Sequence, residues 1–271
     1  MNPNAGAADL FHRLHDGPEI LVLANAWDAG SARLIESLGA AAIATTSAGV
    51  AWSHGYPDGN TLPLELLLAS VKDIVRAVKV PLTVDFEGGY APDPAGVGLA
   101  VARLIDAGGV GVNIEDGNDP PEALCARIEQ AKAAATRSGV NLFVNARTDV
   151  YLRGLAPESK RVGETLARAA RYRDAGADGI FAAGISDPKE IAEVAAGVGL
   201  PLNVLARTGL PPAAALKALG VRRLSAGSGI TQALWGRMSV LARDFLRDGR
   251  SEPLAEGAMV FTQINALLHG G

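Results

Sequence analysis

The most constraining feature of this chain is its repeated alternation of short apolar runs with longer, alanine-rich amphipathic stretches. Eight runs have the length and the small or β-branched residues of buried strands, and a helix-like stretch follows each of them. The expected strands are Ile20–Ala24, Ala42–Thr45, Leu82–Asp85, Gly111–Ile114, Phe143–Arg147, Gly179–Ala182, Leu202–Val204 and Arg222–Ala226. Because these strands lack polar alternation, they are typical of a parallel sheet covered on both faces.

The stretches between the strands predict helices that end at recurring glycines. Leu38-Gly39-Ala40 and Asp174-Ala175-Gly176 each indicate a helix closed by a left-handed glycine before the next strand. The expected helices are Ser31–Leu38, Pro63–Val78, Pro94–Ala107, Glu122–Arg137, Glu158–Ala175, Asp187–Ala196, Pro212–Leu219 and Gly229–Arg247.

Eight βα units predict a (β/α)₈ TIM-type barrel, an α/β fold, with an additional C-terminal helix. A doubly wound open sheet is the alternative, but no G-x-G-x-x-G turn follows the first strand. We expect a single domain over residues 1–271, with the barrel at about 18–248 and the extra helix at about 252–268. That helix could cap the barrel bottom or pack on a partner subunit.

Composition and charge exclude several classes of partner. The net charge is −4 and the basic residues are scattered, so we expect no nucleic-acid partner. No apolar stretch reaches the ~18 residues of a membrane helix, and the polar N-terminus does not resemble a signal peptide. The single cysteine, Cys125, suits a reducing compartment. We therefore expect a cytoplasmic protein without a membrane partner.

Carboxylates follow two of the predicted strands at the point where each strand ends. Asp85 and Glu87 come two positions apart after one strand, and Glu115 ends the next. Side chains at i and i+2 of an extended segment point the same way, so Asp85 and Glu87 could face one pocket. Clustered carboxylates would repel one another without a cation. Carboxylate oxygens suit Mg²⁺, and the segment predicts a metal-dependent site.

Other polar residues occupy the same end of successive strands, where barrel enzymes carry their active sites. Each of them alone has an ordinary explanation, such as a helix cap, a turn or a structural ion pair. Arg147, for example, could pair with Asp149, or it could clamp a substrate carboxylate. The remaining residues of this set are Asn25, Asp28, Thr45, Thr46, Ser47, Asp58, Asn203, Arg207 and Ser225.

Several motifs, in order along the chain, carry a family resemblance. Asn25-Ala26-Trp27-Asp28-Ala29-Gly30-Ser31-Ala32, Ala44-Thr45-Thr46-Ser47-Ala48-Gly49-Val50-Ala51 and Gly55-Tyr56-Pro57-Asp58-Gly59 resemble the isocitrate lyase/phosphoenolpyruvate mutase superfamily. So do Val84-Asp85-Phe86-Glu87-Gly88-Gly89-Tyr90, Asn113-Ile114-Glu115-Asp116 and Asn145-Ala146-Arg147-Thr148-Asp149. The resemblance extends from about residue 20 to residue 245.

The resemblance implies a Mg²⁺-dependent barrel enzyme, with Mn²⁺ as an alternative ion, that makes or breaks a bond beside a 2-oxo acid through a metal-bound enolate. Asp85 would be the main metal ligand, with Asp58, Glu87 and Glu115 acting directly or through water. Thr46, Ser47 and Ala48 would bind the substrate together with Asp85, helped by Arg147 and Asn203. Asp58 and Arg147 are the candidate catalytic residues.

The chain departs from the family pattern in two places. Glu87 stands where the family has Asp, and the loop after the fourth strand is only Gly117-Asn118-Asp119-Pro120-Pro121. The lyases of the family carry a Lys-Lys/Arg-Cys-Gly-His sequence in that loop, whose cysteine is the acid/base group. Cys125 lies within a predicted helix instead, so we expect chemistry that does not use a thiol.

The leading hypothesis is a lyase or decarboxylase acting on a small 2-oxo mono- or dicarboxylate such as oxaloacetate, because decarboxylation requires no thiol acid. A phosphonomutase or phosphonopyruvate hydrolase is an alternative, and a non-catalytic 2-oxo acid binding protein is another. The resemblance also predicts a homo-oligomer, a dimer or tetramer, in which the C-terminal helix is exchanged between subunits.

Overall fold

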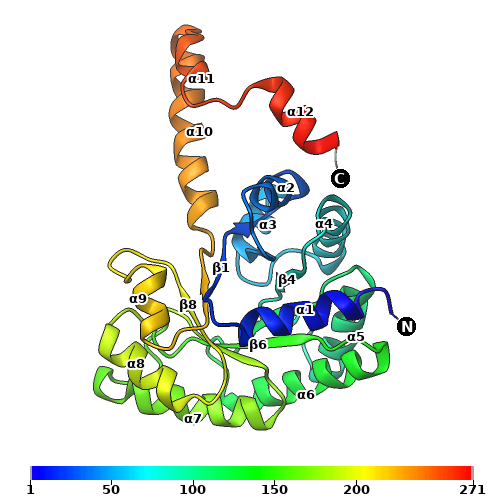
Figure 1. Ribbon diagram of the computed structural model, residues 1–271, viewed down its shortest axis with the longest axis vertical. Coiled ribbons are helices and arrows are strands. Elements are labelled where there is room, and N and C mark those ends of the chain that lie inside the picture. The colour runs from blue at the N-terminus through cyan, green and yellow to red at the C-terminus, as the bar shows by residue number, and fades with distance from the viewer. Residues whose placement is uncertain (1, 270–271) are drawn as a thin grey trace.

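The computed structural model describes residues 2–269 and contains one sheet of nine parallel strands surrounded by helices (Figure 1). The spatial order of the strands is β1-β9-β8-β7-β6-β5-β4-β3-β2. The bounds are β1 Leu21–Leu23, β2 Asn25–Ala26, β3 Ile43–Thr45, β4 Leu82–Asp85, β5 Gly111–Glu115, β6 Phe143–Thr148, β7 Gly179–Ala182, β8 Leu202–Leu205 and β9 Arg223–Ser225.

The first strand is divided, and this division closes the barrel. β1 pairs with β9, and β2, which begins two residues after β1 ends, pairs with β3. The Asn25 side chain lies at this junction, where its Nδ2 donates to the Thr45 carbonyl (2.7 Å) and its Oδ1 accepts from the Gly227 backbone N–H (2.8 Å). β1 and β2 thus act as one strand, and the predicted (β/α)₈ TIM-type barrel is confirmed.

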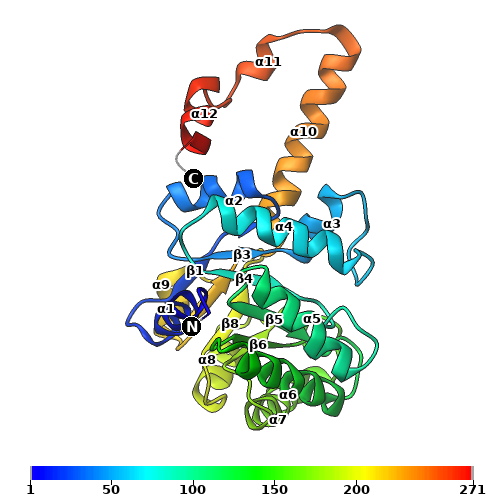
Figure 2. The same cartoon turned by 90° about the vertical axis from the view of Figure 1, so that its right-hand side faces the viewer.

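The helices cover the outside of the sheet in the order that the alternation predicts (Figure 2). The helices that correspond to the eight predicted ones are α2 Ala29–Ser37, α4 Leu64–Ala77, α5 Pro94–Asp106, α6 Pro121–Ser138, α7 Arg161–Asp174, α8 Pro188–Gly197, α9 Ala213–Ala218 and α10 Gly229–Asp248. A short 3₁₀ turn, Glu158–Lys160, precedes α7. Within residues 2–269, no helix has the length and apolarity needed to cross a membrane.

One helix that the sequence did not predict, α1 (Ala5–Asp16), lies across the N-terminal ends of the strands. Phe11 is fully buried there and meets the ring of Phe143, at the start of β6, edge to face with centroids 5.4 Å apart. The His15 ring stacks on Phe143 at 4.0 Å. These rings fill the space that small inward residues leave: a Cβ on Gly111 would come within 2.9 Å of Phe11. The bottom of the barrel is therefore an aromatic plug.

A second unpredicted helix, α3 (Ser47–Ser53), begins directly after β3 in a segment where we expected neither a strand nor a helix. Glycine weakens the local helix propensity, yet Gly49 is required by packing. A Cβ at this position would lie 2.6 Å from Thr46 Cγ2 and 2.9 Å from Thr231 Oγ1. Tertiary contact with the start of α10 therefore explains a helix that the local sequence does not signal.

The predicted helix at 252–268 is wrong as a single element. The structure has two helices instead, α11 (Glu252–Ala255) and α12 (Phe261–His269), and Gly257 between them has a left-handed φ of 73°. These helices do not cap the barrel bottom. α10 projects away from the barrel, and α12 returns toward α2, where Arg33 Nε donates to the Leu267 carbonyl (3.0 Å) (Figures 1 and 2). We call α10 to α12, residues 229–269, the C-terminal arm.

Candidate active site

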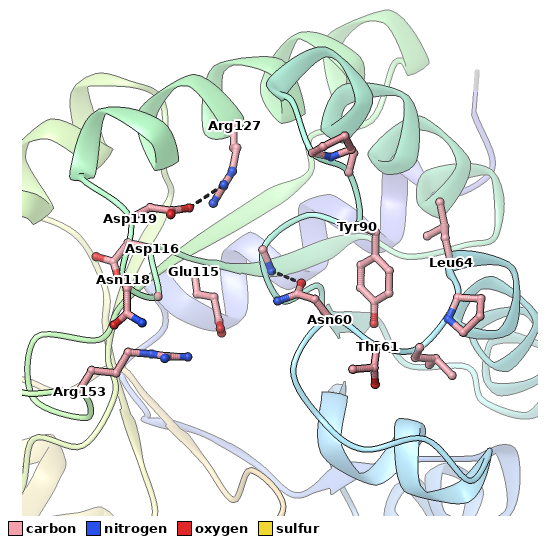
Figure 3. A pocket seen from close by; sticks show the side chains of 16 residues that line it. Asn60, Thr61, Leu64, Tyr90, Glu115, Asp116, Asn118, Asp119, Arg127 and Arg153 are labelled. Carbon is pink, nitrogen blue, oxygen red and sulfur yellow. Dashed lines mark hydrogen bonds and ion pairs between the residues drawn. The ribbon is translucent and has the colours of Figure 1, made fainter.

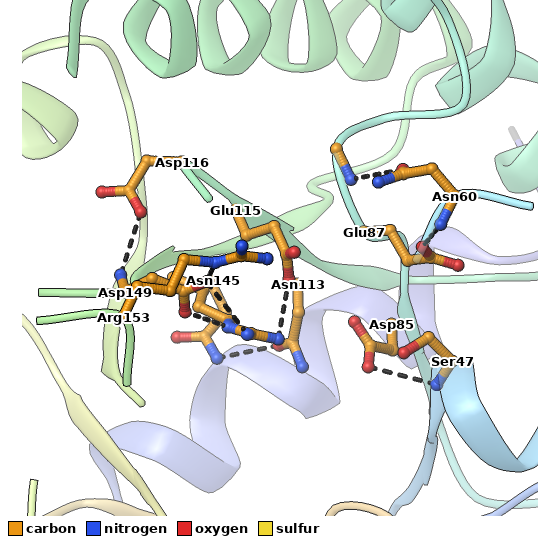
Figure 4. Close-up of polar contacts among 12 residues, drawn as sticks. Ser47, Asn60, Asp85, Glu87, Asn113, Glu115, Asp116, Asn145, Asp149 and Arg153 are labelled. Atoms are coloured by element: carbon orange, nitrogen blue, oxygen red, sulfur yellow. Dashed lines mark hydrogen bonds and ion pairs between the residues drawn. The ribbon is translucent and has the colours of Figure 1, made fainter. Parts of the chain in front are cut away.

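Asp85 ends β4 at the mouth of the barrel and is fixed by the neighbouring strand and helix. Its backbone N–H donates to Thr45 Oγ1 (2.9 Å), and its Oδ2 accepts from the Ser47 backbone N–H (3.1 Å) at the start of α3 (Figure 4). Its Oδ1 has no hydrogen-bond donor among residues 2–269. Asp85 therefore keeps one oxygen available for a ligand.

Glu87 lies at the centre of a strained cluster. Within residues 2–269, the non-glycine residues with positive φ are Asn60 (60°), Glu87 (46°) and Tyr90 (57°). Glu87 joins the other two, because its Oε1 accepts from the Tyr90 hydroxyl (3.0 Å) and its Oε2 accepts from the Asn60 backbone N–H. Asn60 Oδ1 in turn accepts from the Gly88 N–H (3.0 Å). Left-handed backbone costs energy and concentrates at functional sites, so this cluster marks a candidate site.

Glu115 ends β5, Arg147 is the penultimate residue of the adjacent strand β6, and the two form an ion pair. Arg147 Nη1 lies 2.7 Å from Glu115 Oε2, and Arg147 Nε donates to Asp149 Oδ1 (2.7 Å). Arg147 Nη2 reaches the other Asp149 oxygen at 3.2 Å. The Arg147–Asp149 ion pair that the sequence offered as one alternative is therefore present, and it occupies one edge of the guanidinium.

Burial and neighbouring charges raise the pKa values of Glu115 and Glu87. Desolvation raises the pKa of Glu115 to about 7, against the lowering effect of Arg147, and the anions Asp85, Asp149 and Glu87 raise it further. The pKa of Glu87 is also raised, first by desolvation and then by Asp85 and Asp58, although its hydrogen bonds oppose this. The predicted carboxylates of β4 and β5 thus lie close enough to affect one another.

Asp58 is exposed in the loop between α3 and α4 and makes no hydrogen bond or ion pair with Asp85, Glu87 or Glu115 within residues 2–269. Its negative charge contributes to the raised pKa of Glu87 and of Tyr90. Thr46, Ser47 and Ala48 are all buried at the start of α3, with the Ser47 N–H directed at Asp85. Asp28 is not directed at the site, because it caps α2 by accepting from the Ser31 N–H (2.7 Å).

The layer of side chains below the mouth is polar, where barrels usually contain branched aliphatic residues. Asn145 Nδ2 donates to Asn113 Oδ1 (2.8 Å), and Arg223 Nη2 donates to the same oxygen (3.2 Å). Asn203 Oδ1 accepts from Ser225 Oγ (3.2 Å), whereas Asn203 Nδ2 and Arg223 Nη1 are buried with no partner within residues 2–269. The sequence did not identify Arg223, although a basic residue within an apolar strand is a usable signal.

A second network that the sequence missed supports the mouth from behind. Asp116 is buried and accepts from Arg168 Nη1 (2.9 Å), the Tyr172 hydroxyl (2.7 Å) and the Asp149 backbone N–H (2.9 Å). The last bond holds the segment that carries Asp149 and hence orients Arg147. Arg168 and Tyr172 belong to α7, so no local pattern relates them to the β5 carboxylates.

A cavity of about 670 Å³ opens beside Glu115 (Figure 3). The loop before α4 and the segment after Glu87 form one wall, with Asn60, Thr61 and Tyr90. The short loop after β5 and Arg153 form the other wall, and Arg127 of α6 pairs with Asp119 of this loop at 2.7 Å. The cavity is large enough for a small organic acid.

The donor set fits a Mg²⁺ ion that retains most of its water. Glu87 uses both carboxylate oxygens in hydrogen bonds, Glu115 is paired with Arg147, and Asp58 is exposed. Within residues 2–269, no three His, Cys, Asp or Glu side chains are placed together as direct ligands. Asp85 with its available oxygen suits direct ligation, and the other carboxylates suit contact through water, which is the usual pattern for Mg²⁺.

Cys125 lies on α6, half-buried and outside the cavity lining. Burial raises the pKa of its thiol, which disfavours the reactive thiolate. The loop between β5 and α6 is as short as the sequence indicates, and it contributes neither a cysteine nor a histidine to the mouth.

Comparison with known proteins places these features in a family. Residues 11–246 match the phosphoenolpyruvate phosphomutase family model. An uncharacterized protein of Mycobacterium tuberculosis is 39% identical, covering 80% of this chain and 81% of its own length. The 2,3-dimethylmalate lyase of Eubacterium barkeri is 32% identical, covering 74% and 73%. The structure of a candidate lyase/mutase from Burkholderia cenocepacia J2315 is 36% identical, with a TM-score of 0.88 and coverage of 97% and 95%.

Proposed function

Because the chain belongs to the isocitrate lyase/phosphoenolpyruvate mutase superfamily, whose members are mostly lyases and mutases, we propose that it is a Mg²⁺-dependent carbon–carbon lyase or decarboxylase. Its substrate would be a small 2-oxo mono- or dicarboxylate such as oxaloacetate. The observation that carries this proposal is the arrangement of the mouth: an Asp85 carboxylate with an available oxygen faces the Glu115–Arg147 pair beside a cavity.

The residues of the mouth would divide the work. Asp85 would hold Mg²⁺ directly, and Glu87, Glu115 and Asp58 would hold it through water. When bound, Mg²⁺ would act as a Lewis acid that stabilises negative charge developing on the 2-oxo group. The buried residues 46–48 at the N-terminus of helix α3 would position the substrate carboxylate together with the Asn203 amide. Arg147 would add a fixed positive charge.

The short β5–α6 loop supports decarboxylation over phosphoryl chemistry. A migrating or attacked phosphoryl group needs several hydrogen-bond donors or cations, and Asn118 is the one side-chain donor that this loop presents to the cavity, beside the anions Asp116 and Asp119. A decarboxylase needs neither those contacts nor a thiol acid, and Cys125 lies outside the cavity.

Turnover of oxaloacetate with and without EDTA tests the proposal. We expect pyruvate formation above the rate of free Mg²⁺ alone, loss of that activity with EDTA and recovery when Mg²⁺ or Mn²⁺ is added. Binding of oxaloacetate with no turnover would favour a non-catalytic binding protein, and turnover of phosphonopyruvate alone would favour the phosphonate chemistry.

We also propose a cytoplasmic homo-oligomer, in which a second copy packs on the C-terminal arm. The arm exposes large apolar side chains, including Leu246 at 84% and Phe261 at 77%. Several large apolar side chains exposed on one segment are typical of an interface. Light scattering at micromolar concentration should give the mass of a dimer or tetramer. Removal of residues 250–271 should reduce the number of subunits in the particle. A monomeric full-length chain would contradict the proposal.

A further inference from the structure

A second arginine, Arg153, lies on the wall of the cavity beside Glu115 (Figure 3). Its Nε donates to the buried Asp149 (2.8 Å), and its backbone N–H donates to the Asp149 carbonyl (2.8 Å). Neither terminal nitrogen of Arg153 has a hydrogen-bond acceptor within residues 2–269. The guanidinium is therefore anchored at one edge and offers the other edge to the cavity.

The other charged groups around the cavity are engaged with one another. Arg127 pairs with Asp119 at 2.7 Å, Glu115 with Arg147 at 2.7 Å, and Asp116 with Arg168 at 2.9 Å. Arg153 shares its single partner, Asp149, with Arg147, so its charge is only partly offset. Its side chain is also 43% exposed, against 16% for Arg147 and 17% for Arg127.

We propose that Arg153 determines specificity by binding the second carboxylate of a short 2-oxo diacid whose 2-oxo acid end lies at the Asp85–Glu115 mouth. This inference rests on the proposed function. A guanidinium edge with two outward N–H groups matches a carboxylate in a two-pronged contact. The anchored Nε adds preorganisation, because Arg153 need not be ordered when the substrate arrives.

The position of the Arg153–carboxylate contact predicts which kinetic constant depends on it. A carboxylate held by Arg153 is stabilised in the bound substrate, and a carboxylate that leaves as CO₂ loses its charge in the transition state. Contacts that are stronger in the ground state improve binding without raising the rate of the chemical step. Loss of Arg153 should therefore raise KM for a diacid and leave kcat unchanged or higher.

Calorimetric binding in the presence of Mg²⁺ tests the proposal without turnover. L-Malate and L-lactate differ by one carboxylate, and oxalate provides only the group that would occupy the mouth. We expect the wild-type protein to prefer malate, and Arg153→Met to reduce the malate-to-lactate preference by roughly ten- to a hundredfold, the scale of hydrogen bonds to charged groups. Oxalate lacks the second carboxylate that Arg153 would bind, so its affinity should change by less than about threefold.

Arg127→Met is the matched control, because it removes a cation from the same cavity that is already paired with Asp119. It should leave the malate-to-lactate preference unchanged. An unchanged preference in Arg153→Met, or an equal loss in both variants, would overturn the proposal. Arg153→Gln repeats the measurement if the methionine variant is less stable. If oxalate does not bind the wild-type protein in the presence of Mg²⁺, the proposed function is contradicted as well.

Discussion

The bottom and the mouth of the barrel are built from the same strands but are filled in opposite ways. At the bottom, Phe11, His15 and Phe143 pack as stacked and edge-to-face rings under α1. At the mouth, carboxylates and guanidinium groups gather beside the left-handed residues Glu87 and Tyr90. The bottom therefore gains stability from burial, whereas the mouth holds like charges and strained backbone at an energetic cost that suggests function.

The largest effect expected at the mouth follows from Asp85→Ala. This change should abolish Mg²⁺ binding and activity, because it removes the carboxylate oxygen available to the ion. The stability without metal should stay within about 1 kcal/mol, because loss of the Ser47 hydrogen bond is offset by reduced repulsion. Metal titration and urea unfolding would measure both. Glu115→Ala should weaken Mg²⁺ less, and wild-type Mg²⁺ affinity in Asp85→Ala would show that another residue is the ligand.

The opposite result is expected at the bottom, from Phe11→Ala. Removing a fully buried ring should lower the free energy of unfolding by about 3–5 kcal/mol. It also removes the ring that lies 6.0 Å from the Arg223 guanidinium carbon. Urea unfolding would measure the loss, and kcat of the folded fraction should be unchanged. A variant as stable as wild type but inactive would contradict the division between the two ends.

Arg147→Lys tests whether positive charge alone is sufficient at the mouth. One ammonium cannot serve Glu115 and Asp149 together, so we expect a loss of about 2–4 kcal/mol in transition-state binding, measured as kcat/KM. Arg76→Lys, in an exposed pair with Asp73, is the control and should leave kcat/KM unchanged. Full activity in Arg147→Lys would exclude a role for the planar guanidinium.

His15 makes the stability of the bottom depend on pH. Burial, followed by the nearby Arg223, lowers the pKa of His15 from its usual 6.5 to about 3. The unfolded chain then binds the proton first, so stability is full above pH 6.5 and falls as pH decreases toward 3. Between pH 6.5 and 5 the loss should be about 2 kcal/mol. Measuring the free energy of unfolding of wild type and His15→Gln at pH 6.5 and pH 5 isolates the contribution of His15. If both proteins lose the same stability between the two pH values, His15 is not the cause.

Cys125→Ser should produce the smallest change. The thiol lies on α6 outside the cavity, so kcat should change by less than about twofold, under half a kcal/mol on the rate scale. Steady-state kinetics on oxaloacetate with a circular dichroism check would measure it. A folded but inactive Cys125→Ser enzyme would show that the reaction depends on the thiol, as in the lyases of the family.

The sequence by itself determined the barrel and placed the predicted polar residues at the carboxyl ends of its strands. Alternation of apolar strands with amphipathic helices is a local, repeated signal. Asp85 and Glu115 are the residues that end β4 and β5, and Arg147 lies one residue before the end of β6. The positions of α1, α3 and the break in the C-terminal arm were not predicted, because they depend on packing and on single glycines such as Gly49 and Gly257.

Only the tertiary structure decided how the charges are paired. Arg168 and Tyr172 reach Asp116 across more than 50 residues, at sequence separations of 52 and 56, and Arg223 reaches Asn113 across 110. Such pairings have no local pattern, since the closed barrel brings distant strands together. Arg153 likewise differs from Arg147 in exposure and in which of its nitrogens have partners, and the second difference arises from the folded positions of Glu115 and Asp149.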